Sequence, residues 1–150
     1  MIQAIYDGEQ VLASNTDTVD FNTIDLRTNS AQCYNGWLNY NAGSPQFNII
    51  AGGIYEVSFN ANVTSAEVGN IALALFTDGT ELAGTEMDAV VATAGNWHNV
   101  SFVKRFRVCP RGNVTLTINS VPTTTYAGTS TATEIPTIKN ANITISRVNG

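Results

Sequence analysis

The sequence predicts an all-β fold, a jelly-roll β-sandwich of two antiparallel sheets. Apolar residues recur at every second position, turn signals rich in Gly, Asn and Asp separate the short stretches, and no segment combines helix caps with a 3.6-residue apolar stripe. The 150 residues suit one domain over 1–150, in which residues 1–34 form an N-terminal arm or first strands that pack on it. Hydrophobic residues make up 43% of the chain and charged residues 13%, a balance that argues against intrinsic disorder.

The first clear strand lies at residues 55–63. Its apolar positions alternate with Glu, Ser and Asn, as expected of a strand with one buried and one solvated face. These apolar positions are Tyr55, Val57, Phe59, Ala61 and Val63.

Residues 71–76 are apolar on both faces, so that a helix is also compatible with them. The Asp78-Gly79 pair that follows decides for a strand, because it is the strongest short signal for a hairpin with a type I′ turn. We therefore predict a hairpin of strands at 70–77 and 81–87. The first of these strands is expected to be covered by the core on one side and by another subunit on the other.

Three further strands follow the same two-residue period. In residues 100–109 Lys104 interrupts the apolar face, which predicts a bulge or an interface position there. The other two strands lie around residues 114–119 and 142–148. Residues 122–136, rich in Thr and containing Tyr126, are expected to form a long exposed loop.

The charge of the chain limits the classes of partner that it can bind, and its two cysteines allow two interpretations. The net charge of −5 and pI of about 4.6 argue against nucleic acid, although Lys104, Arg105, Arg107 and Arg111 form a local basic cluster. We interpret this cluster as solvated or interface-facing strand residues, with an anionic partner as the alternative. Cys33 and Cys109 are interpreted as two small buried apolar residues, although a bridge stays open if the fold brings them together.

The sequence contains no enzymatic signature. His98 is the sole histidine and offers neither a catalytic triad nor a multi-histidine metal site. Nucleotide-binding glycine motifs and the Gly-x-Ser-x-Gly motif are absent as well. We predict no catalytic residue, no cofactor and no metal site, while a calcium ion held by loop oxygens stays an alternative. The N-terminus lacks the features of a signal peptide and no apolar run could cross a membrane, so we expect a soluble intracellular product or one released by lysis.

Residues 47–59 read Phe-x-Ile, a glycine turn, and then Gly-x-Tyr-x-Val-x-Phe. This element resembles the signature strand of the jelly-roll superfamily shared by tumour necrosis factor (TNF) and the globular heads of complement. The strand at 71–76 and the Asp78-Gly79 turn continue the same order, and the resemblance covers residues 35–150. It points in particular to the bacterial and bacteriophage branch, which includes exosporium glycoprotein heads and phage head-fibre and decoration proteins.

Two differences from the animal members of this superfamily narrow the range of expected functions. No collagen-like stalk precedes the domain, and residues 142–148 replace the aromatic-Gly C-terminal strand. A cytokine-like receptor ligand is therefore not expected. A short chain that begins at its own Met, without stalk or signal peptide, suits a phage gene better than a spore-coat gene.

The resemblance implies a TNF-like homotrimer without enzymatic activity that is part of a bacteriophage virion, as a capsid decoration or head- or tail-fibre protein. Its implied partners are a capsid or tail protein and a host-surface glycan. The alternative is a carbohydrate-binding or spore-surface adhesion module.

Two sets of residues are candidates for contacts. Strands that are apolar on both faces would leave a large exposed patch on a monomer, and such patches usually mark interfaces. The expected trimer interface consists of Tyr55, Phe59, Ile71, Leu73, Leu75 and Phe76. Aromatic rings can stack on sugar rings, although packing in the core or at an interface is the alternative for each. The expected ligand or partner contacts are Trp37, Tyr40, Trp97 and Tyr126, with Tyr34 beside them.

Overall fold

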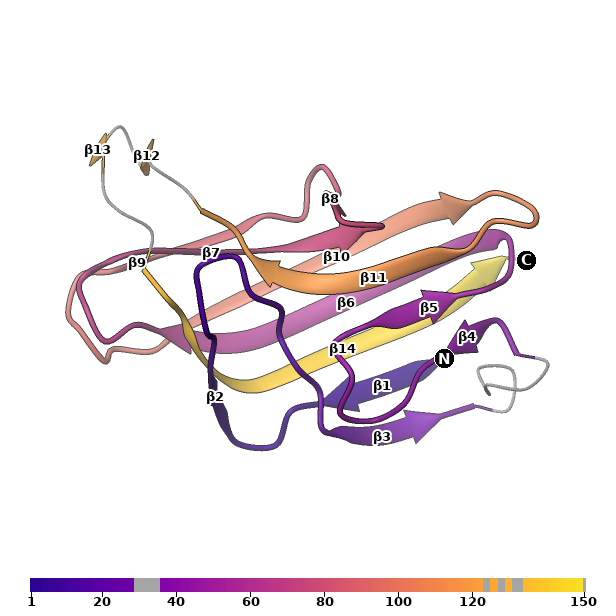
Figure 1. The fold of residues 1–150 in the computed structure, drawn as a ribbon, viewed down its shortest axis with the longest axis horizontal. Coiled ribbons are helices and arrows are strands. Elements are labelled where there is room, and N and C mark those ends of the chain that lie inside the picture. The colour runs from indigo at the N-terminus through magenta and orange to yellow at the C-terminus, as the bar shows by residue number, and fades with distance from the viewer. Residues whose placement is uncertain (29–35, 123–124, 127–128, 131–133, 150) are drawn as a thin grey trace.

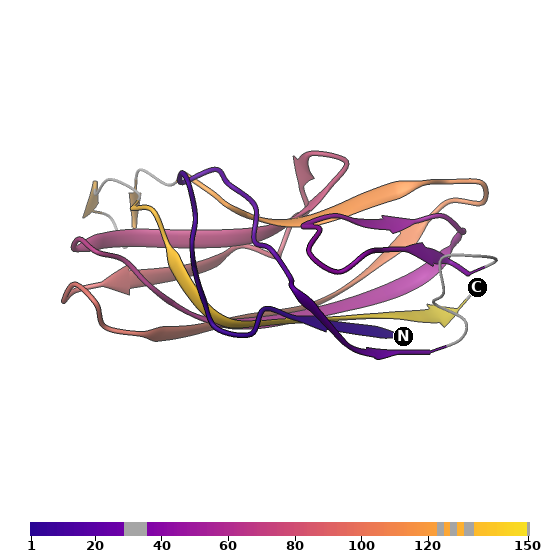
Figure 2. The same cartoon turned by 60° about the horizontal axis from the view of Figure 1, so that its bottom comes forward.

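Antiparallel strands build two facing layers in the computed structural model (Figures 1 and 2). The structure describes residues 1–28, 36–122, 125–126, 129–130 and 134–149. Cys33 and Tyr34 lie outside these ranges. Among the described residues the elements are strands and no helix occurs, and hence none that could span a membrane. The predicted all-β jelly-roll sandwich is confirmed.

The first sheet has the order β10-β6-β14-β1-β3, with β2 paired to β14. Its strands are β1 (Ile2–Ile5), β2 (Glu9–Val11), β3 (Thr23–Arg27), β6 (Gly53–Thr64), β10 (His98–Val108) and β14 (Thr137–Asn149). The last strand, β14, therefore lies between β6 and β1, and long connections cross from one sheet to the other (Figure 1). This interleaving of strands that are distant in sequence is the jelly-roll arrangement.

The second sheet has the order β4-β5-β11-β7-β8, with β9 paired to β7. Its strands are β4 (Leu38–Asn39), β5 (Phe47–Ile49), β7 (Gly69–Thr77), β8 (Thr80–Glu81), β9 (Met87–Val91) and β11 (Val114–Ser120). Within the predicted loop at 122–136, a short pair forms from β12 (Thr125–Tyr126) and β13 (Thr129–Ser130).

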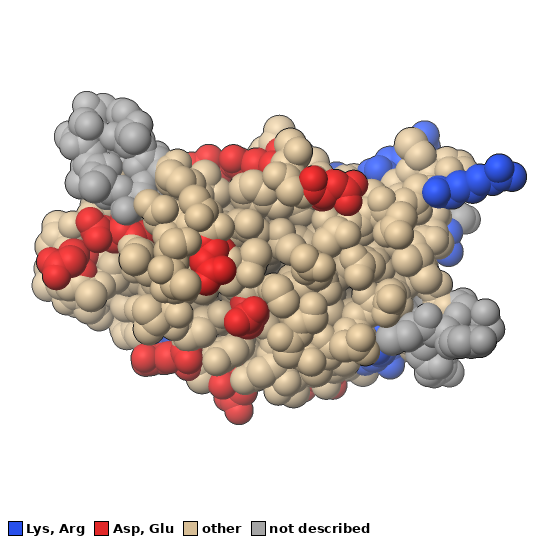
Figure 3. Space-filling model, viewed as in Figure 1, with Lys and Arg blue, Asp and Glu red and all other residues tan. Residues whose placement is uncertain are grey.

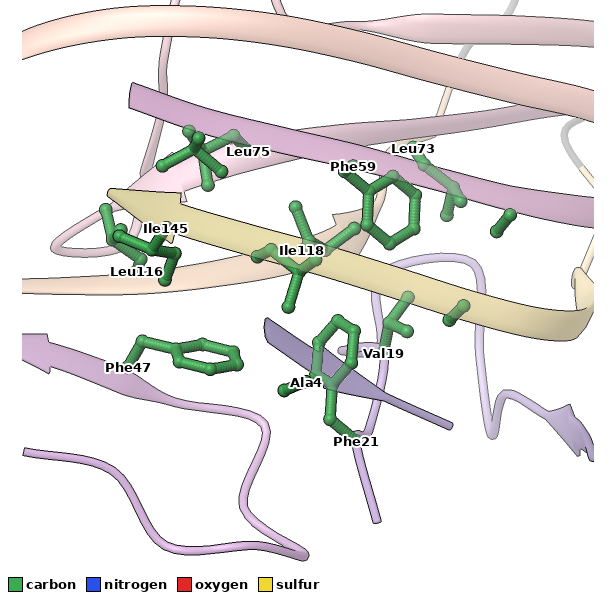
Figure 4. Close-up of a cluster of buried hydrophobic side chains, with 14 of the residues drawn as sticks. Ala4, Val19, Phe21, Phe47, Phe59, Leu73, Leu75, Leu116, Ile118 and Ile145 are labelled. Atoms are coloured by element: carbon green, nitrogen blue, oxygen red, sulfur yellow. The ribbon is translucent and has the colours of Figure 1, made fainter. Parts of the chain in front are cut away.

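The core lies between the two sheets, where buried hydrophobic side chains from both layers form one cluster (Figure 4). Phe21 is central to it, because its ring meets Phe47 edge-on at 5.4 Å between centroids and Phe59 at 6.4 Å. These three aromatic rings come from a loop and from both sheets, so they join the two layers. Burial of such large apolar side chains supplies most of the free energy that holds the sandwich closed.

The Asp78-Gly79 hairpin is confirmed. Asp78 has φ 50° and Gly79 φ 79°, the positive values that a type I′ turn requires, and Thr77 pairs with Thr80. The second predicted strand, 81–87, is wrong in its extent, since it divides into β8 and β9. The buried Thr85 is the reason: its hydroxyl accepts a hydrogen bond from the backbone N–H of Leu75 at 3.1 Å, in place of a strand partner.

Two other predictions are corrected. No bulge occurs at Lys104, because β10 pairs with β6 in unbroken register from His98 to Val108. Lys104 instead points to the core side near the sheet edge, where its ammonium approaches Gly84. Cys109 is exposed rather than buried.

Candidate functional site

The outward face of the first sheet is formed by β10, β6, β14, β1 and β3. The strand register defines a row across it, which runs from Val103 through Ser58, Thr144 and Gln3 to Leu26. The chain neighbours of these residues on β6, β14 and β1 point into the core, so the alternation of the strands sends this row outward. Leu26 joins the row because β3 shifts its register opposite β1 between Gln3 and Ala4.

Small and uncharged side chains fill the middle of this face. A second row places Ser101, Asn60 and Asn142 side by side, and the Gln3 amide donates to the Asn142 side chain at 3.4 Å. In a third row the Asn99 amide donates to Asn62 at 3.3 Å. Side chains of this size let another protein surface approach the sheet closely.

Exposed apolar residues stand at both edges of the face. Val103 on β10 is 66% exposed and Leu26 on β3 is 46% exposed. One ion pair lies near Val103, in which the Arg105 guanidinium donates to Glu56 at 2.7 Å. Because this pair is largely exposed, it contributes at most about 1 kcal/mol, and the two charges mainly neutralise each other.

The residues predicted to form the trimer interface lie elsewhere. Tyr55, Phe59, Ile71, Leu73 and Leu75 are 0–1% exposed and belong to the core between the sheets of one chain, whereas Phe76 is half-buried. On the other face of β7, the small residues Ala72 and Ala74 are also buried; Ala72 is the register partner of Asp88 on β9, and Ala74 that of Asn119 on β11. Both faces of β7 are therefore buried within a single chain, and no second subunit is needed to cover them.

Two of the aromatic residues predicted to contact a ligand are core residues. Tyr40 stacks on Phe47 with 4.0 Å between ring centroids, and its hydroxyl donates to the carbonyl of Phe21 at 3.1 Å. Burial, with the nearby charge of Asp20, raises the pKa of Tyr40 to about 12. Trp37 is 4% exposed and packs on Tyr55 with 5.3 Å between centroids. Neither ring offers an open face for stacking, which corrects the prediction.

The other two aromatic residues predicted to contact a ligand are Trp97 and Tyr126. Trp97 is 36% exposed, and the Lys139 ammonium lies 4.6 Å from its ring centroid, so one side of this ring holds a cation. The side chain of Tyr126 lies outside the described part of the structure. Among the described residues, no group of three or more His, Cys, Asp or Glu side chains could hold a metal ion.

No protein-family model matches the sequence, and no curated protein matches it at sequence level. Solved structures do match. The globular domain of zebrafish complement 1qA protein aligns over 98% of this chain and 95% of its own, with a TM-score of 0.64 at 13% identity. Eiger TNF from S. frugiperda aligns over 98% and 92%, with a TM-score of 0.59 at 8% identity. Murine APRIL aligns over 97% and 98%, with a TM-score of 0.55 at 9% identity.

The chain is a TNF/C1q-like jelly roll. The match spans nearly the whole of each chain, so the likeness in fold extends over nearly the whole of this protein. At identities of 8–13% the likeness concerns the fold alone, and function has to be argued from the surface.

Proposed function

We propose that this chain is a non-enzymatic assembly protein, a homotrimer that decorates a bacteriophage particle as a capsid decoration or head- or tail-fibre protein. The observation that carries the proposal is the outward face of the first sheet, with its small uncharged centre and exposed Val103 and Leu26 at the two edges. Threefold assembly is typical of this fold.

Contact through this face would remove exposed apolar side chains from water. Val103 and Leu26 are the apolar groups to be covered, and Arg105 already has Glu56 as its partner. The polar rows of Asn, Ser and Thr can exchange water for hydrogen bonds across the interface. The face is therefore better suited to a subunit contact than the core residues that the sequence favoured as the trimer interface.

The assignment to a virion is supported by the resemblance of residues 47–59 to the phage and bacterial branch of the superfamily. The loops between strands gather at the two ends of the sandwich (Figure 1), which leaves one end of a trimer for the particle and the other for the host. A trimer also presents each weak site three times and gains avidity from it.

Attachment to a particle is the direct test. Particles of the phage that encodes the chain are purified from a strain in which its gene is deleted, and the recombinant protein is added back. We expect the protein to sediment with the particles at a fixed saturating ratio and to be found in wild-type particles by mass spectrometry. A gene that belongs to no phage, or a protein absent from purified wild-type particles, would overturn the virion assignment.

A glycan-binding module is the second candidate, and Trp97 is the observation that favours it. Among the four predicted contacts, Trp97 is the aromatic residue whose described side chain is partly exposed. A glycan array with the wild-type protein and Trp97→Ala separates the two functions, since a decoration role alone predicts no Trp97-dependent signal.

A further inference from the structure

The β5–β6 turn, the β10–β11 turn and the end of β14 lie at the same end of the sandwich (Figure 1). A groove opens between them. Its volume is about 590 Å³, within the range of sites that hold small organic ligands. Its lining combines apolar residues with two arginines. The lining residues are Gly52, Gly53, Ile54, Arg107, Val108, Pro110, Arg111 and Asn149.

The charge of this groove is positive, although the protein as a whole carries −5. Arg107 and Arg111 line it, no carboxylate side chain does, and neither guanidinium forms an ion pair within the described part of the chain. Arg147 lies beside it and donates to the Gly52 carbonyl. Figure 3 shows Lys and Arg side chains gathered at one end of the molecule, while Asp and Glu lie over the rest of the visible face.

The backbone that carries these arginines is tightly packed. A Cβ added at Gly52 would lie 2.8 Å from the Cα of Pro110, so the two turns touch with no room for a side chain between them. The second turn is closed by a hydrogen bond from the N–H of Gly112 to the carbonyl of Cys109 at 2.8 Å. The groove is therefore already formed without a ligand, which lowers the entropic cost of binding.

Arg111 has a conformation that its side chain disfavours. It is the third residue of the turn that begins at Cys109, after Pro110, and its φ is 63°. Turns with Pro second and positive φ third normally place Gly or Asn at the third position. An arginine there costs stability, and such local strain concentrates at functional sites. Glycine at this position would make the fold more stable. The presence of an arginine there therefore suggests that its guanidinium has a function.

We propose that this groove is an anion-binding site, for a ligand that presents a carboxylate or phosphate group to Arg107 and Arg111 and an uncharged body to the wall of Ile54, Val108 and Pro110. Guanidinium groups bind both anions through paired hydrogen bonds, and no carboxylate side chain of the described residues lines the groove to compete for them. The apolar wall distinguishes the site from a surface that attracts free phosphate alone.

Backbone amide NMR on the full chain tests the site residue by residue. Inorganic phosphate, glucuronate and glucose are titrated at constant ionic strength into the wild type, Arg107→Gln, Arg111→Gly and Lys139→Gln. The last variant removes the same charge beside Trp97, away from the groove, and serves as the matched control.

We expect phosphate and glucuronate to shift the amide signals of Gly52, Gly53 and residues 107–109, 111 and 112 in a saturable way, with glucose silent. Affinity should fall about tenfold in both groove variants and stay unchanged in Lys139→Gln. Arg111→Gly should bind weakly and yet melt no lower than the wild type, because glycine relieves the positive φ. Shifts that are spread over the surface or do not saturate, equal affinity in the groove variants, or equal binding of glucose and glucuronate would each overturn the proposal.

Discussion

Asp88, in β9, shows how a single residue of this sandwich responds to its surroundings. Partial burial, a hydrogen bond with the Glu86 side chain and the negative charge of Glu86 raise the pKa of Asp88 from 3.8 to about 6. The folded protein therefore holds this proton more tightly than the unfolded chain does. As pH rises from about 4 to 6, the folded state has to release a proton that the unfolded state has already lost, so the free energy of unfolding falls across this window.

Replacing Asp88 with Asn should remove this pH dependence. We expect Asp88→Asn to raise the melting temperature at pH 7.5 and to leave it nearly unchanged at pH 3.5, where the carboxyl of the wild type is neutral. Thermal unfolding followed by circular dichroism at both pH values measures the difference. Glu67→Gln, the same change of charge on an exposed turn, is the control. Parallel melting curves for Asp88→Asn and wild type at all pH values would contradict the expectation.

At the scale of elements, the β7–β8 hairpin is held by more than its own turn. The N–H of Asp78 donates to the carbonyl of Thr115 at 2.9 Å, and the Asp78 carboxylate accepts from the N–H of Thr115 at the same distance. The turn residue thereby continues the ladder of β11 past the end of β7. The Asp-Gly pair consequently fixes both the hairpin and its register against the neighbouring strand.

Gly79→Val should destabilise this hairpin. Valine at φ 79° places a β-branched side chain in the left-handed region, at a cost of about 1–3 kcal/mol. For a chain of this length each kcal/mol lowers the melting temperature by about 2–4 °C. The control is Thr80→Val, the next residue, which is exposed and has an ordinary φ. If both variants melt together with the wild type, the strain argument fails.

At the scale of the whole molecule, the proposed trimer makes a quantitative prediction. The chain has a mass of 16.0 kDa, so light scattering should give about 48 kDa at micromolar concentration. Val103→Glu places three like charges in the contact and should shift the mass toward that of the monomer. Val68→Glu alters a comparably exposed valine, 59% against 66%, in the turn between β6 and β7 and should leave the mass unchanged.

Each alternative outcome has a definite meaning. A wild-type mass of 16 kDa at micromolar concentration would exclude the trimer. A stable trimer of the Val103→Glu variant would exclude the outward face of the first sheet as the contact.

The sequence could predict the parts of this protein that depend on near neighbours along the chain. Alternation of apolar and polar residues at 55–63 marks β6, because successive side chains of a strand point to opposite faces whatever the strand pairs with. The Asp78-Gly79 turn was equally local, since the requirement for positive φ belongs to two adjacent residues. From strands and turns of this kind the all-β jelly roll followed.

Partners and burial were decided only by the tertiary structure. The apolar residues at 71–76 show that β7 is covered on both faces, but not that the same chain covers it. Nothing in the sequence was a ground for placing Tyr40 in the core and Trp97 at the surface. Their contacts in the structure separate them, because Tyr40 stacks on Phe47 whereas Trp97 lies beside the Lys139 ammonium. The anion groove joins Gly52 and Arg111, 59 positions apart, through the pairing of Gly53 with Val108. Alternation specifies which faces of a strand are buried, whereas the choice of neighbour is a long-range property of the closed sandwich.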